Sequence, residues 1–127
     1  MSSLVSISYA QSASYNGTAL NSTTAVVSDF LYQYQIAYAA STTNSQLAIA
    51  FDYTKIQAFY ALSVGDDCTL KFNSTGSPAP SITIKNSVPY QWLLASGVTN
   101  PFAANVTTLY VSTTAGCTLY LLFQVNK

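Results

Sequence analysis

The chain contains few side chains that could perform chemistry. Its 127 residues include four Asp and four Lys, and neither His, Glu nor Arg occurs. General acid–base and nucleophilic catalysis need a base that works near neutral pH, which His or Glu most often supplies. Asp29 and Asp52 could in principle form a glycosidase-type carboxylate pair, but no motif supports that pairing. We therefore expect no catalytic residue and a protein that is not an enzyme.

Metal and cofactor sites are equally poorly supported. Asp66 and Asp67 could offer oxygens to Ca²⁺, yet the other ligands of such a cage are missing nearby, so a solvated turn is favoured. Zinc would have to rely on Cys68 and Cys117, which lie far apart in the sequence. Two cysteines are too few for a disulfide framework, and we favour two buried thiols over a bridge. We expect no metal and no cofactor.

Aromatic side chains are the best candidates for a binding surface. Exposed Tyr and Trp rings are common where proteins bind sugars or other proteins. Some of these rings lie in a run that alternates along one expected strand, and others surround the only tryptophan. Packing in the core is the favoured interpretation of both groups, and an interface is the second. The candidate interface residues are Tyr32, Tyr34, Tyr38, Tyr90, Trp92 and Phe102.

Low charge bears on the partners. The net charge is zero and no arginine is present, so the chain lacks the basic surface that binds nucleic acid. No apolar run approaches the length of a membrane span, and the first residues lack the pattern of a signal peptide, so synthesis in a cytoplasm is expected. So little charge gives copies little repulsion, which favours a homo-oligomer.

The elements that must position these residues are β-strands. Apolar and polar residues alternate with the period of two that is typical of a half-buried strand. Segment 56–64 also fits helical spacing, but its β neighbours favour a strand. The last segment is apolar on both faces, which predicts a central position or an interface. The expected strands are 5–9, 30–39, 47–53, 56–64, 68–72, 82–84, 107–111 and 117–125.

The regular spacing of turn signals between these segments predicts the fold class. We expect a single domain over residues 1–127, built as an antiparallel β-sandwich of about eight strands. Its topology is either jelly-roll or immunoglobulin-like. Residues 1–15 either contribute the first strand or form an extended arm outside the sandwich.

Short fragments across residues 49–125 resemble a known group of proteins. They follow one another in the same order and spacing as in small tailed-bacteriophage virion proteins called decoration, cement or auxiliary capsid proteins. The fragments are Phe51-Asp52, Lys55-Ile56-Gln57, Thr69-Leu70-Lys71, Asn73-Ser74, Pro89-Tyr90-Gln91-Trp92, Asn100-Pro101-Phe102, the segment 106–111 and the closing apolar strand. The resemblance implies a small β-sandwich on a capsid surface, commonly a trimer, with the major capsid protein as its partner. This chain departs from the group in its many tyrosines and its low charge.

The function expected from the residues and the resemblance together is structural. A protein that binds the outside of a phage capsid and bridges major capsid subunits needs contact area rather than titratable groups. Many weakly bound copies then act together through multivalency. Two alternatives stay open: a glycan- or receptor-binding module of a phage fibre or tail, and a subunit of an extracellular filament.

Overall fold

The computed structural model describes residues 4–76 and 80–127, and this part of the chain is almost entirely β-structure. All pairings between the strands are antiparallel. The strands are β1 (Val5–Tyr15), β2 (Thr18–Ser28), β3 (Phe30–Tyr38), β4 (Thr42–Leu47), β5 (Ile56–Val64), β6 (Cys68–Phe72), β7 (Ser81–Ile84), β8 (Tyr90–Leu93), β9 (Leu109–Thr113) and β10 (Cys117–Val125). Two short 3-10 helices, η1 (Tyr53–Lys55) and η2 (Leu94–Ser96), interrupt them. Neither helix is long or apolar enough to cross a membrane, and the described residues hold no other.

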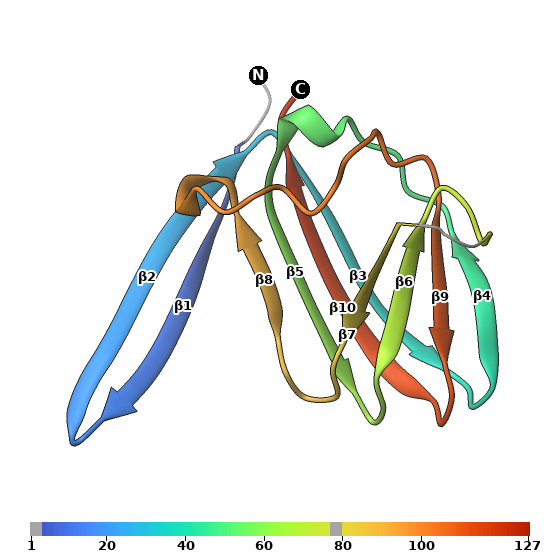
Figure 1. Cartoon of the computed structure of the whole chain (residues 1–127). Coiled ribbons are helices and arrows are strands. Elements are labelled where there is room, and N and C mark those ends of the chain that lie inside the picture. Colours follow the sequence, from blue (N-terminus) through green and yellow to red (C-terminus); the bar gives the residue numbers. More distant parts are fainter. Residues whose placement is uncertain (1–3, 77–79) are drawn as a thin grey trace.

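Eight of the strands form two four-stranded sheets that make a sandwich (Figure 1). One sheet has the order β3-β10-β5-β8 and the other has the order β4-β9-β6-β7. The first strand of the sandwich therefore pairs with the last, the second with the seventh, and so on inward, as in one long hairpin that has been rolled up. This nested pairing is that of a jelly roll. An immunoglobulin-like sandwich would instead pair its first two strands with each other.

The core lies between the two sheets. Strand β10 contributes Leu119, Leu121 and Phe123 at alternate positions, and the ring of Phe123 stacks on Phe59 of β5 with centroids 4.8 Å apart. Full burial of each such side chain contributes about 1.5–3 kcal/mol to folding. Strand β10 lies between β3 and β5, so of the two places predicted from its apolar faces, the centre of a sheet or an interface, it occupies the first.

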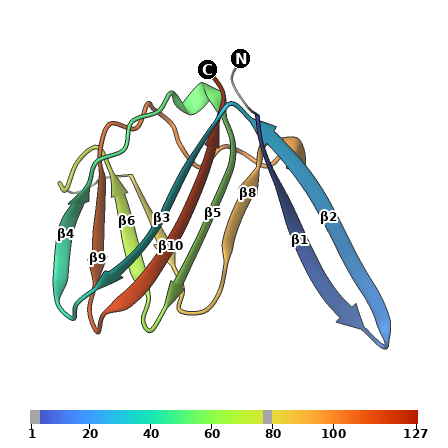
Figure 2. The same ribbon diagram turned by 180° about the vertical axis from the view of Figure 1, so that it is seen from behind.

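The remaining two strands, β1 and β2, form a separate hairpin, which we call the arm (Val5–Ser28). Its eleven residue pairs run from Val5 opposite Ser28 to Tyr15 opposite Thr18. The turn between them is Asn16-Gly17, and both residues have positive φ angles, 49° and 79°, as a two-residue type I′ turn requires. Both views show the arm beside β8 and diverging from the sandwich towards its tip (Figures 1 and 2).

Several sequence expectations about strands need correction. The described residues form ten strands, of which eight make up the sandwich as predicted, and β2 and β8 are the two that were not predicted. β2 is rich in Ser and Thr, and β8 has only four residues, so neither shows a clear alternation. The expected strand 47–53 is also misplaced: β4 ends at Leu47, and Phe51 makes only an isolated bridge to Val106. The ambiguous segment 56–64 is the strand β5, as predicted.

Candidate functional site

The four tyrosines of the predicted interface line the inner side of one sheet. Tyr32, Tyr34 and Tyr38 alternate along β3, and Tyr90 lies on β8 opposite Ala61. All four are half-buried and pack against the core. Burial raises the pKa of Tyr34, Tyr38 and Tyr90 above the usual value, because the charged phenolate is poorly solvated there. The favoured interpretation of these rings as core residues is confirmed.

The two other predicted interface residues are buried. Trp92 and Phe102 are each 4% exposed. The indole Nε1 of Trp92 donates a 2.9 Å hydrogen bond to the carbonyl oxygen of Val98, and the ring of Phe102 meets Phe72 edge-on at 4.9 Å between centroids. Both rings therefore fill the core, and an interface cannot use them unless the loops that cover them move.

All four aspartates hold turns or chain ends. Asp52 accepts hydrogen bonds from the hydroxyl and the backbone N–H of Thr54, and these bonds lower the pKa of its carboxyl group. Asp67 accepts from the backbone N–H of Asn86 and from Lys85, which likewise lowers its pKa. The other two accept from backbone N–H groups, Asp29 from Lys127 and Asp66 from Ala115. The lowered pKa values of Asp52 and Asp67 are opposite to the shift that a general acid needs near neutral pH.

The two cysteines approach each other from opposite sheets. Cys68 begins β6 and Cys117 begins β10, and both are buried free thiols. Burial is the main cause that raises the pKa of Cys68 to about 12. A thiol with so high a pKa carries almost no thiolate near neutral pH and is chemically inert there. Within the described residues, no group of three His, Cys, Asp or Glu side chains could hold a metal ion.

A buried polar cluster fastens the root of the arm to the sandwich. Gln124 of β10 is fully buried on the outer side of its sheet. Its Oε1 accepts a 2.7 Å hydrogen bond from the hydroxyl of Tyr9, and its Nε2 donates to the carbonyl oxygen of Val26 at 3.0 Å and to Oγ of Ser28 at 3.2 Å. Buried polar groups cost free energy unless they are paired, and every member here is paired. The cluster therefore sets where the arm leaves the body.

Sequence reasoning did not single out this cluster. Two local signals were available: Asn16-Gly17, a strong hairpin signal, and a glutamine inside an otherwise apolar strand. Neither signal shows that Tyr9 and Gln124, 115 residues apart, are partners.

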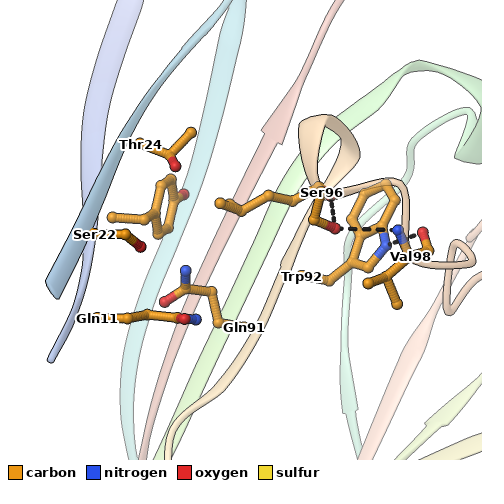
Figure 3. Close-up of a pocket in the computed structure, with 9 residues that line it drawn as sticks. Gln11, Ser22, Thr24, Gln91, Trp92, Ser96 and Val98 are labelled. Atoms are coloured by element: carbon orange, nitrogen blue, oxygen red, sulfur yellow. Dashed lines mark hydrogen bonds between the residues drawn. The ribbon is translucent and has the colours of Figure 1, made fainter. Parts of the chain in front are cut away.

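A cleft of about 310 Å³ opens between the arm and the edge of β8 (Figure 3). Gln11, Ser22 and Thr24 line it from the arm, and Gln91 and Ser96 line it from the sandwich. None of these side chains is charged. Amides and hydroxyls donate and accept hydrogen bonds without titrating near neutral pH, so the cleft suits recognition of a neutral polar group rather than acid–base chemistry.

A second uncharged surface lies on the outer side of the β3-β10-β5-β8 sheet, which we call the outer face. The register of the strands places amide side chains next to large apolar and aromatic side chains on this face. They surround a shallow groove of about 250 Å³. The outer face consists of Gln33, Gln35, Tyr60, Leu62, Tyr120 and Leu122.

The structure thus presents an arm, a neutral cleft and a neutral sheet face. No protein-family model, no curated protein and no solved structure matches the chain. The resemblance to phage decoration proteins therefore rests on the sequence fragments alone.

Proposed function

We propose that the chain is a non-enzymatic structural protein of a bacteriophage virion. It binds the outside of the capsid and stabilises the shell by bridging major capsid subunits. The single observation that carries the proposal is the arm, whose residues 10–23 are all exposed and extend away from the sandwich. A small body with such an arm can contact two neighbours at once.

The surface chemistry supports the same role. Bridging a shell requires contact area and main-chain hydrogen bonds, and the arm, the cleft and the outer face supply these without charge. Each copy needs only a weak contact, because many copies on a regular lattice act together through multivalency. Jelly rolls are common in viral capsid proteins, which is an analogy at the level of the fold and not evidence of function.

The test is attachment to capsids. Capsids prepared without this protein are mixed with the purified chain, sedimented, and then heated alongside untreated capsids. We expect the chain to sediment with the capsids and to raise the temperature at which they release DNA. A matched comparison uses a chain that lacks residues 10–23, with a Gly-Ser link in place of the arm tip. A chain that stays in the supernatant and leaves the melting temperature unchanged would refute the proposal.

The cleft favours a second candidate function, a glycan-binding module of a phage fibre or tail. Its uncharged amides and hydroxyls match the hydroxyl groups of a neutral sugar, and its volume is within the range of small-ligand sites. Against this, the rings of Tyr9 and Trp92 at the cleft are nearly fully buried and offer no stacking platform. A glycan array separates the two functions. This candidate is supported if the chain binds a sugar, if Gln91→Ala abolishes that binding and if Gln35→Ala preserves it.

A further inference from the structure

One side of the arm is only half covered. In an antiparallel hairpin, directly opposed residues share a face, so the register places Ile7 with Val26 and Ala13 with Leu20 on the same side. We call this side the inward face. Near the root it packs on the sandwich, where Tyr9 is 5% and Val26 is 9% exposed. The full set is Val5, Ile7, Tyr9, Gln11, Ala13, Tyr15, Thr18, Leu20, Ser22, Thr24, Val26 and Ser28.

Towards the tip, the residues that the structure describes leave the inward face largely uncovered. Leu20 is 57% exposed and Tyr15 is 70% exposed. The opposite face carries small residues at the same level, with Ser14 opposite Ala19. An isolated two-stranded hairpin is marginally stable in water at best, so the tip gains order only if its apolar side is covered. No residue between 4 and 28 is charged, which excludes attraction of a strongly charged partner.

The outer face resembles the uncovered tip of the arm in its chemistry. It is neutral and partly apolar, and no described segment crosses its groove between Tyr60, Leu62 and Tyr120. A smaller hollow of about 190 Å³, lined by Ile7, Tyr9, Tyr60 and Leu122 among others, joins this face to the root of the arm. The contact that the root already makes with the sandwich is therefore continuous with the uncovered groove.

We propose that the tip of the arm packs on the outer face of a second copy of this chain. The arm diverges from its own sandwich in both views, so its tip does not lie on its own outer face (Figures 1 and 2). Both surfaces are uncharged and both carry Tyr and Leu side chains, so neither repels the other. Because the arm tip and the outer face are different patches, two copies can exchange arms as a two-fold pair, and head-to-tail contacts would instead form a ring or an open filament.

This inference is independent of capsid attachment, since it concerns what holds copies together in solution. A chain that forms oligomers without binding capsids would support it and refute the proposed function. A chain that stays monomeric in solution but binds capsids would refute this inference and support the proposed function.

The first test is a pair of arm variants. Leu20→Lys places a charge on the inward face at the tip, and Ser14→Lys places the same charge on the opposite face one residue pair away. We expect wild type and Ser14→Lys to sediment as oligomers, and Leu20→Lys to sediment as a monomer or with a dissociation constant raised at least about tenfold. Leu20→Thr removes most of the apolar area of this side chain but keeps a residue that favours β-strands. It therefore controls for the possibility that Leu20→Lys acts by unfolding the arm.

The second test is complementation between two defective chains. Gln35→Lys charges the outer face at an exposed site, and Thr83→Lys, on the other sheet, is its control. Leu20→Lys keeps an intact outer face, and Gln35→Lys keeps an intact arm. We expect each to be monomeric alone and the mixture to form heterodimers, because one sound arm then meets one sound outer face. Thr83→Lys should behave as wild type.

Three results would overturn the inference. One is a wild-type chain that sediments as a monomer at its solubility limit. Another is that Leu20→Lys and Ser14→Lys sediment in the same way. The last is an oligomer that survives both Leu20→Lys and Gln35→Lys.

Discussion

The hydroxyl of Tyr9, in the first strand, donates a 2.7 Å hydrogen bond to Oε1 of Gln124, in the last strand. Gln124 is fully buried and Tyr9 is nearly so. The chain connects the arm to the body through Asp29, the residue between β2 and β3, and this bond adds a second link beside the bonds from Nε2 of Gln124 to Val26 and Ser28. It connects the stability of the arm to the integrity of the central strand.

Removal of the donor should loosen the arm. Tyr9→Phe leaves Oε1 of Gln124 buried without its hydroxyl partner, which costs about 1–3 kcal/mol. We expect faster protease cleavage within residues 5–28 and a lower urea midpoint. Ser12→Ala removes an exposed hydrogen bond to Asn21 in the same arm and should change stability by less than about 0.5 kcal/mol. Equal cleavage rates for the two variants would contradict this role of Gln124.

High pH should also weaken the attachment of the arm. Burial raises the pKa of Tyr9 from its ordinary value of 10.0 to about 12. Only the neutral phenol fits the site, so its contribution to stability is complete below pH 10 and is lost as the pH rises through about 12. Protease accessibility of the arm should therefore increase between these values. The increase should be absent in Tyr9→Phe, whose arm is already loosened at neutral pH.

The absorbance of tyrosinate checks the same assignment directly. The difference between the titration curves of wild type and Tyr9→Phe isolates one phenol. We expect that difference to have a midpoint near pH 12 rather than near 10. A midpoint near 10 would show that Tyr9 is solvated.

The thiols should be unreactive in the folded protein. The pKa of Cys68 is raised to about 12 from an ordinary value of 9.0, so at about pH 8 it holds roughly a thousandfold less thiolate than an exposed cysteine. We expect slow labelling by a thiol reagent in buffer and rapid labelling of both cysteines in urea. Complete resistance to labelling in urea without a reductant would indicate a disulfide and contradict the free thiols seen here.

The aromatic centre of the core should dominate stability. Phe123 stacks on Phe59 and also contacts Phe51, with ring centroids 5.4 Å apart. Phe123→Ala should therefore cost about 3–5 kcal/mol in free energy of unfolding. Val88→Ala, at a position 58% exposed, should cost less than about 0.5 kcal/mol. Chemical denaturation followed by tryptophan fluorescence measures both.

Much of the local structure followed from the sequence. The strands β3, β5 and β10 were predicted because alternation of apolar and polar residues along a strand is a local property that the pleat imposes. Candidate site residues were harder to assign, because an aromatic ring suits a core and an interface equally well. For Trp92 the core was favoured over an interface, and its indole Nε1 donates a hydrogen bond to the carbonyl oxygen of Val98, in a loop that the sequence does not place.

The sequence by itself determined the all-β class, the two apolar faces of the last strand and the scarcity of titratable groups, since these depend on composition and on neighbours two residues apart. Only the tertiary structure decided that β3 pairs with β10 in a jelly roll, that the first strand joins β2 in an arm, and that Gln124 holds this arm. These relations join residues up to 115 positions apart, and side-chain periodicity carries no information about partners at that distance. Long-range pairing is chosen by which faces can be buried together, and that is a property of the whole chain.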